Sequence, residues 1–203
     1  MQVRKLSIPD AFEITPRQHR DDRGVFLEWY RLDVLAASVG HPLDLGQANI
    51  SVSKRGVARG IHYADVPPGQ GKYVTVSRGA GIDYVVDIRV GSPTFGRWES
   101  IRLDDVDRRA VYLAEGLGHA FIALEDDTTL TYLVSDTYKP DSEHAISIVD
   151  PQIALEFPAE LGEPLLSPKD RDAPSLSARV ADGSLPTAKD ARARYVELTE
   201  AIR

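Results

Sequence analysis

A histidine and an arginine stand three residues apart in Arg59-Gly60-Ile61-His62, a pairing that suits proton transfer beside an anion. An imidazole works as a general acid or base near neutral pH, and a guanidinium binds phosphate or carboxylate. Such a pair is also common among ordinary strand residues, and strict alternation would put Arg59 and His62 on opposite faces. Gly60 offers a way to bring them together, because a glycine inside a strand often marks a bulge that re-aims its neighbours.

A lysine and a tyrosine in two predicted strands could complete such a site. Lys72 shares a strand face with Val74 and Val76, which would turn its ammonium group toward the mouth of a barrel, although a lysine at a strand start is usually solvated. Tyr132 belongs to the apolar face of the predicted strand 129–134. A phenol there can donate a proton, but a core tyrosine hydrogen-bonded to backbone is the more common arrangement. The sequence leaves both alternatives open at each position.

The chain lacks the patterns of several other kinds of site. Its histidines form no His-x-His pair and it has no cysteine, so we expect no metal ion. These histidines are His19, His41, His62, His119 and His144. The glycine-containing segment 67–72 lacks the Walker spacing and a following helix, which disfavours a phosphate-binding loop. The segment SPKD at 167–170 has, on its local pattern alone, the composition of a turn.

Composition and charge limit the classes of partner. The 203 residues are 42% hydrophobic and 27% charged, with a formal net charge of -7, which is typical of a globular domain and unfavourable for binding nucleic acid. The longest apolar runs are only a few residues, so we expect no membrane span, and residues 1–10 lack the apolar core of a signal peptide. We therefore expect a cytoplasmic protein built as one domain, residues 1–203.

The middle of the chain predicts antiparallel β structure. Short runs rich in Val, Ile, Tyr and Thr recur about every ten residues, separated by clusters of Gly, Pro and Asp. The predicted strands are 73–77, 82–88, 99–103, 110–113, 129–134 and 145–149. They make a β core of about residues 45–150, in an all-β sandwich or barrel with short flanking helices.

Helical patterns flank this core on both sides. Apolar residues recur at helical spacing over 32–39, and Gly40 supplies a C-terminal stop. Near the C-terminus, apolar residues share one face of a predicted helix over 189–202. The stretch 167–187 is rich in Pro, Ser and Asp and predicts a loop, within a C-terminal loop-and-helix region of about 160–203.

Taken together and in order, these segments resemble the family of dTDP-4-dehydrorhamnose 3,5-epimerases and its relatives in antibiotic deoxysugar pathways. The matching stretches are DRGVFLE (22–28), QANIS (47–51), RGIHY (59–63), GK (71–72), VDIR (86–89), SPTFG (92–96), EGLGHA (115–120), SDTY (135–138), DP (150–151) and SPKD (167–170). The resemblance spans about residues 1–175. The tract DVPPGQGKY at 65–73 looks most like the dTDP-4-keto-6-deoxyglucose 3-epimerases of antibiotic pathways.

The resemblance implies a fold, an assembly and a set of site residues. The family has a cupin-type jelly-roll fold, works without metal or nicotinamide, and forms homodimers. By resemblance, His62 is the base and Asp170 orients its imidazole. Lys72 stabilises the enolate, and Tyr132 is the acid on the far face of the sugar. The other matching positions bind substrate: Arg23, Glu28, Gln47, Asn49, Arg59, His119, Glu143 and Lys169, with Tyr138 stacked on thymine.

Several positions depart from the family pattern. Ile61 and Ala64 replace the Leu and Gln of a Gly-Leu-His-Tyr-Gln motif. Gly118 and Ala120 replace the Ala and Gly of Ala-His-Gly, and Thr137 replaces the first of two paired tyrosines. No implied catalytic group is lost, but each change reshapes the region expected to hold the sugar. The resemblance therefore leaves open whether C3 alone or both C3 and C5 are inverted.

The implied reaction suits these residue types. In dTDP-4-dehydro-6-deoxy-D-glucose the C4 ketone acidifies the C–H bonds at C3 and C5. An imidazole, with a reference pKa of about 6.5, can remove such a proton, and a lysine can stabilise the resulting enolate. Inversion needs a second proton donor across the ring, and a tyrosine hydroxyl can serve. Arg23, Arg59 and Lys169 would bind the pyrophosphate, which explains how an acidic chain can hold a doubly anionic ligand.

We therefore expect an isomerase of deoxysugar biosynthesis that inverts C3, or C3 and C5, of a dTDP-4-keto-6-deoxy sugar. One alternative is a 3,4-ketoisomerase of the same barrel type, which moves the ketone without net inversion and would be distinguished by NMR of the product. Another is a sugar-nucleotide-binding module, which would bind dTDP without any exchange of sugar protons.

Overall fold

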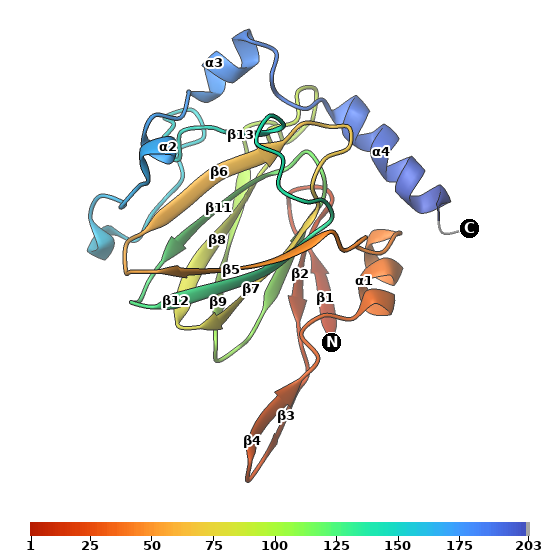
Figure 1. Ribbon diagram of the computed structural model, residues 1–203, viewed down its shortest axis with the longest axis vertical. Coiled ribbons are helices and arrows are strands. Elements are labelled where there is room, and N and C mark those ends of the chain that lie inside the picture. Colours follow the sequence, from red (N-terminus) through yellow and green to blue (C-terminus); the bar gives the residue numbers. More distant parts are fainter. Residues whose placement is uncertain (202–203) are drawn as a thin grey trace.

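The computed structural model describes residues 1–201, which form two antiparallel β-sheets packed against each other (Figure 1). In order across the first sheet the strands are β1 (Gln2–Lys5), β2 (Ala11–Thr15), β10 (Ala110–Leu113), β7 (Lys72–Arg78), β12 (Thr128–Val134) and β5 (Gln47–Ser53). Across the second they are β13 (Glu143–Ala145), β6 (Ala58–Ala64), β11 (Gly118–Ala123), β8 (Ala80–Val86) and β9 (Trp98–Asp104). The all-β prediction is confirmed.

Alternation along the strands gives each sheet an inner and an outer face. Val74 and Leu130 of the first sheet meet Val85 and Phe121 of the second in an apolar core between the sheets. This core fills only part of the interior. The rest of the inner faces carries the polar side chains that the sequence singled out.

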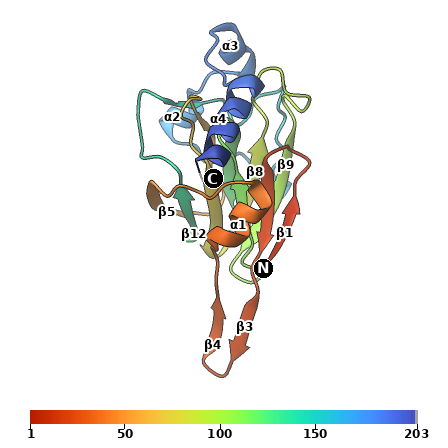
Figure 2. The ribbon, with the colours of Figure 1, turned by 90° about the vertical axis from the view of Figure 1, so that its right-hand side faces the viewer.

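Helices and the C-terminal segment cover the outer faces. Outside the first sheet, α1 (Leu32–Val39) and Tyr195 of α4 (Ala188–Glu200) pack over Tyr73 and Tyr112, and Figure 2 shows α1 and α4 on the same side of the molecule. Outside the second sheet, the segment that contains α3 (Leu176–Ala181) packs over β6 and β8. No helix within residues 1–201 is both long and apolar enough to cross a bilayer.

The boundaries of the β core need correction at both ends. The core begins before residue 45, because β1 pairs with β2, and β2 pairs with β10. The predicted strand 145–149 is wrong after its first two residues: β13 ends at Ala145, Ile146 still exchanges both backbone hydrogen bonds with Ile61 of β6, and a turn follows at 148–149. Short strands of this kind owe their conformation to distant partners rather than to their own sequence.

The predicted C-terminal loop 167–187 is also wrong, because it contains two short helices. In α2 (Pro168–Arg171) and α3 the residue before the helix is a serine whose side chain accepts a hydrogen bond from a backbone N–H of the first turn. These caps stabilise the two helices, which are too short to show a periodic apolar pattern in the sequence. The predicted helix 189–202 corresponds to α4, which ends at Glu200, and Ile202 lies outside the described residues.

A bulge at Gly60 turns Arg59 and His62 to the same side of β6. On β11, His119 pairs with His62 but Phe121 pairs with Arg59, so one extra residue is accommodated in β6 between the two pairs. Gly60 has a φ of 114°, a region that favours glycine. Ile61 and Ala58 point outward into the apolar cluster under α3, which leaves Arg59 and His62 facing inward. The bulge that the sequence offered as one possibility at Gly60 is present.

Replacing Gly60 by alanine should disturb both the backbone and the pairing with β11. An added Cβ would lie 2.4 Å from the His119 carbonyl oxygen, and the left-handed φ would be strained as well. We expect Gly60→Ala to lower the free energy of unfolding by roughly 2–4 kcal/mol in urea titrations. Gly24→Ala is the matched control, since Gly24 has a φ of 129° with nothing within 4 Å of its added Cβ. An equal loss in both variants would mean that backbone strain alone, and not contact with β11, fixes Gly60.

Candidate active site

An imidazole–carboxylate pair joins β6 to α2. Nε2 of His62 lies 2.7 Å from Oδ1 of Asp170, and the His62 side chain remains 35% exposed while that of Asp170 is only 5% exposed. This hydrogen bond fixes the orientation of the ring and leaves Nδ1 as the ring nitrogen available for proton transfer. The contact connects residues 108 positions apart, so no local pattern could have predicted it.

The cap of α2 holds Asp170 in place. Ser167 accepts a hydrogen bond from the Asp170 backbone N–H, and its hydroxyl donates to Oδ2 of the Asp170 carboxylate at 2.8 Å. Burial by itself would raise the pKa of Asp170, but the hydrogen bond and charge of His62 outweigh it and hold that pKa below its ordinary value. Asp170 therefore stays ionised as a partner for an imidazolium.

Tyr132 lies on the inner face of the opposite sheet. Its side chain packs against the apolar core. In the sheet, Tyr132 of β12 is paired with Asn49 of β5 on one side and with Val74 of β7 on the other. Burial raises the pKa of Tyr132, the charge of Arg59 lowers it, and Glu143 raises it again, with a net increase. The inward orientation inferred from alternation is confirmed, and the phenol stays protonated and able to donate.

Lys72 begins β7 on the same inner face and is 8% exposed. In residues 1–201 no carboxylate oxygen lies within 4 Å of its ammonium group. Burial lowers the pKa of Lys72, while the charges of Glu143 and Asp83 act in the opposite direction. The sequence left the direction of Lys72 open, and the structure turns it inward, so this face holds a cation that is poorly solvated and only distantly compensated.

A second imidazole–carboxylate pair lies beside the first. His119, cross-strand neighbour of His62, has Nε2 2.6 Å from Oδ2 of Asp83, which is fully buried on β8. The other Asp83 oxygen has no hydrogen-bond partner among residues 1–201. Asp83 was not among the predicted site residues, although a single carboxylate in the apolar run Ile82–Val86 is itself a signal, since a charge is rarely buried without a partner.

Other residues implied to bind substrate surround this group. The Arg59 guanidinium donates to Ser53 across the sheets at 3.1 Å. Gln47 donates its amide to Asn49 at 2.7 Å and accepts a hydrogen bond from the Tyr138 backbone N–H at 3.1 Å. Tyr138 is 54% exposed at this end of β5, so its ring is accessible for stacking.

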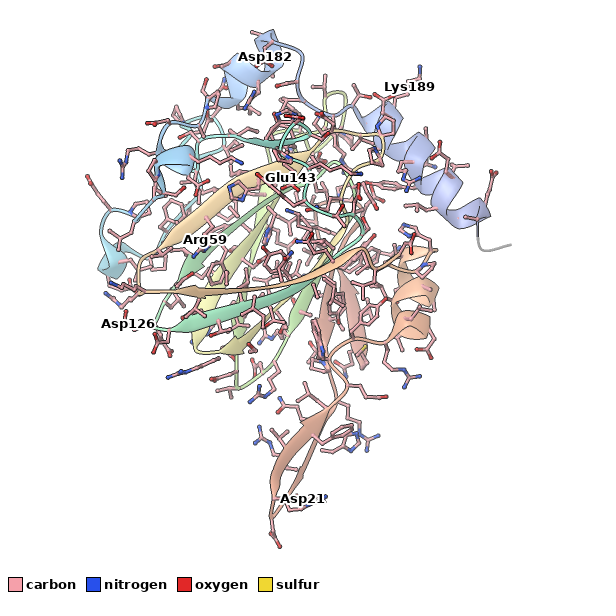
Figure 3. All side chains as sticks on the ribbon, viewed as in Figure 1. Asp21, Arg59, Asp126, Glu143, Asp182 and Lys189 are labelled. Atoms are coloured by element: carbon pink, nitrogen blue, oxygen red, sulfur yellow. The ribbon has the colours of Figure 1, made fainter. Side chains whose placement is uncertain are left out.

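Glu143 of β13 completes the polar set from the edge of the second sheet. Its Oε1 accepts hydrogen bonds from the Gln70 amide at 3.3 Å and from the Lys139 backbone N–H at 3.4 Å. Figure 3 shows Glu143 and Arg59 on the same side of the sandwich, near β6. Ala64 and Thr137, two of the departures from the family pattern, line one small crevice together with Glu143.

Arg23, Glu28 and Lys169 lie apart from these residues in the single chain. Arg23 follows β3 (Gln18–Asp21) and precedes β4 (Gly24–Leu27), in a hairpin that projects from the body; its side chain is 89% exposed and pairs with Asp21. Figure 3 marks Asp21 far from Arg59 and Glu143. Glu28 is exposed and pairs with an arginine of its own segment, and Lys169 is exposed on α2.

Comparison with known proteins identifies the family. The family model described as dTDP-4-dehydrorhamnose 3,5-epimerase matches residues 5–178. The chain belongs to this epimerase family. A dTDP-4-dehydrorhamnose 3-epimerase of Streptomyces niveus is 58% identical over 187 residues, which cover 92% of this chain and 89% of that protein.

Solved structures of other members have the same fold. The rmlC epimerase of Mycobacterium tuberculosis superposes with a TM-score of 0.96 at 48% identity, covering 98% of this chain and 100% of that one. NovW, a 4-keto-6-deoxy sugar epimerase from the novobiocin biosynthetic gene cluster of Streptomyces spheroides, gives a TM-score of 0.92 at 56% identity, with 94% and 95% covered. The cupin-like jelly roll implied by the resemblance is therefore confirmed, and the chain is an epimerase, a member of the isomerase class.

Removing the Asp83 charge should shift the pH range of activity. Because Asp83 raises the pKa of Lys72, Asp83→Asn should lower that pKa further, and loss of activity on the alkaline side should begin on the order of one pH unit lower. An amide carries no charge and so holds the His119 imidazole less strongly than the carboxylate does, and Asp83→Asn should also reduce kcat about 10-fold or more. The measurement is kcat as a function of pH.

Asp65→Asn provides the matched control for Asp83→Asn. It alters a third imidazole–carboxylate pair, His144 Nε2 to Asp65 Oδ1 at 2.8 Å, in which the His144 ring packs at a tilt of 39° against the outward-facing Tyr63. We expect no alkaline shift in this variant. A profile of Asp83→Asn that coincides with that of Asp65→Asn would show that Asp83 does not set the charge of Lys72.

Proposed function

We propose that this epimerase inverts C3 of dTDP-4-dehydro-6-deoxy-D-glucose by removing a proton on one face of the sugar and returning one on the other. The observation that supports this most strongly is the position of His62 and Tyr132 on the inner faces of opposite sheets, with Lys72 among them. The 58% identical relative is named a 3-epimerase, which favours C3. NovW, named for a novobiocin gene cluster, supports a role in antibiotic deoxysugar biosynthesis.

His62 is the base in this proposal. Its imidazole takes the C3 proton of the ketone while Asp170, ionised and capped by Ser167, stabilises the imidazolium that forms. The negative charge that leaves C3 moves to the C4 oxygen. A cation held in the low-dielectric interior, such as Lys72, stabilises that oxygen more than it would in water.

Tyr132 returns the proton from the opposite side. A buried phenol with a raised pKa is protonated throughout the neutral range, so it can donate to the enolate as soon as the enolate forms. The phenolate left behind lies within the influence of Arg59, whose positive charge acts to lower the pKa of Tyr132. The sugar would lie between the two sheets, with Tyr138 at the nucleotide end.

Deuterium uptake tests the assignment of the base. Incubated in D2O without added cofactor, the parent enzyme should introduce deuterium at C3 with inversion, and His62→Asn should slow the uptake by roughly 10²–10⁴-fold. NMR of the recovered sugar gives the position and number of labelled carbons, and a second label at C5 would assign a 3,5-epimerase. Uptake by His62→Asn at the parent rate would remove His62 from the mechanism, and a carbonyl at C3 would indicate a ketoisomerase.

We further propose that the working enzyme is a homodimer and that Arg23 serves the site of the partner subunit. The β3–β4 hairpin pairs with neither main sheet, and Phe26 on it is 68% exposed. An isolated two-stranded hairpin is only marginally stable in water. The edge strand β5 also exposes Ile50 by 70% and Val52 by 58%. A second copy that covers both features would bring Arg23 toward a site that its own chain does not reach.

Mixed dimers test this arrangement. Arg23→Ala and His62→Asn should each abolish most activity in homodimers, but a heterodimer of the two would contain one site with both residues intact. Random assembly from equal amounts should therefore restore about one quarter of the parent activity.

The pair His62→Asn and Tyr132→Phe is the control for this experiment. Both of these residues belong to one chain's site, so mixing the two variants should restore nothing. No recovery with Arg23→Ala and His62→Asn, although size-exclusion chromatography shows mixed dimers, would rule out a shared site.

A further inference from the structure

Several elements of the candidate site begin or end at one end of the sandwich. β7 begins at Lys72, β5 begins at Gln47, and β12 ends at Val134, which pairs with both of those residues. His119 is the second residue of β11. The relative positions of these four strand ends determine where the catalytic groups lie, so a side chain that connects the strand ends helps to position those groups.

Glu115, in the turn between β10 and β11, lies at this junction. Its side chain is buried at 2% exposure, and two glycines make room for it. A Cβ on Gly69 would lie 2.5 Å from the Cβ of Glu115, and one on Gly71 would lie 3.1 Å from its Oε1. The turn 69–71, which leads directly into Lys72, is thus packed against the Glu115 side chain.

Ser135 connects Glu115 to the start of β7. Its hydroxyl donates to Oε1 of Glu115 at 3.2 Å and accepts a hydrogen bond from the Gly71 N–H at 2.8 Å. The Ser135 backbone N–H in turn donates to the Gly71 carbonyl at 3.0 Å. Ser135 therefore continues the pairing of β12 with β7 by one residue, and Glu115 is the third member of the contact.

The C-terminal helix α4 anchors the same turn from outside. The Tyr195 hydroxyl donates to the Glu115 carbonyl at 2.5 Å, and Arg89 lies 3.4 Å from that hydroxyl. Burial raises the pKa of Tyr195, so its hydroxyl remains a donor. α4 lies beyond residue 178, where the family match ends, so this anchor is supplied by a part of the chain outside the family model.

We propose that Glu115 is a positioning residue for the epimerase reaction: with Ser135 it holds the turn 69–71 and thereby fixes where Lys72 enters the interior. Oε2 of Glu115 has no hydrogen-bond partner in residues 1–201, so a buried carboxylate is kept here at a cost in stability. Gly71 precedes Lys72 and has no side chain, so it cannot itself pack against its surroundings and fix where β7 begins. The contact with Glu115 supplies that constraint. The inference rests on the proposed function.

A double-mutant cycle separates positioning of Lys72 from a general loss of structure. Glu115→Ala should lower the rate of deuterium uptake at C3 about 10-fold or more, because small displacements of a catalytic group are costly. In a Lys72→Ala background the same change should cost less than about 2-fold, since the group being positioned is gone. Glu115→Gln keeps the shape and the acceptor oxygen and should stay within about 3-fold of the parent. Equal losses in both backgrounds would overturn the proposal.

If Glu115→Ala fails to fold, Ser135→Ala can replace it in the double-mutant cycle. It removes the bridging hydroxyl while leaving Glu115 in place, and the same non-additivity with Lys72→Ala is expected.

Amide hydrogen exchange gives a readout that needs no catalysis. Exchange of the Gly71 N–H should be at least about 10-fold faster in Ser135→Ala and in Glu115→Ala than in the parent, and unchanged in Glu115→Gln. Protection that persists in both alanine variants would show that Glu115 does not hold the turn. A parent enzyme without uptake at C3 would contradict the proposed function, whereas faster exchange would still establish the contact.

Discussion

Charge buried between two β-sheets is the constraint around which this molecule is organised. A β-sandwich normally fills its interior with apolar side chains, and here Val74, Leu130 and Phe121 do so over only part of the space. The remaining inner positions carry histidines, a lysine and carboxylates, each costly to bury alone. Two imidazoles meet this cost with short hydrogen bonds to carboxylates, while Lys72 relies on charges at greater distance. A poorly compensated cation in such an interior, such as Lys72, is well suited to stabilise a developing oxyanion.

Local sequence predicted β7, β8, β9, β10 and β12, because alternation depends only on neighbouring residues. The inward orientation of Tyr132 followed from such a pattern, whereas the sequence left the direction of Lys72 open and offered the bulge at Gly60 only as one possibility. β1 to β5 and β11 were not among the predicted strands. β1 and β2 form because β2 pairs with β10 and β1 pairs with β2, which are contacts far apart in the sequence. The helices α2 and α3 were missed for a different reason: each depends on a serine cap rather than on an apolar face.

The candidate site depended on information that single segments do not contain. The local sequence around Asp170 predicts only a turn. The resemblance of the ordered motifs to the epimerase family was what connected Asp170 to His62, 108 residues away. Asp83 was within reach of physical reasoning, because a lone carboxylate in an apolar strand requires a buried partner. Arg23 is different: it lies on an exposed hairpin that projects from the body, paired only with Asp21 among the described residues. The role proposed for it in a partner's site depends on how two copies assemble, which no pattern in a single chain contains.

The central claim is that proton removal and proton return occur on opposite faces of one sugar, through two different side chains. Tyr132→Phe in D2O tests it most directly, because this variant keeps the base and loses the second donor. We predict that substrate recovered from Tyr132→Phe carries deuterium at C3 with its configuration retained, since His62 can return a proton only to the face from which it took one. Inversion at the parent rate in this variant, or a complete absence of exchange, would contradict the account.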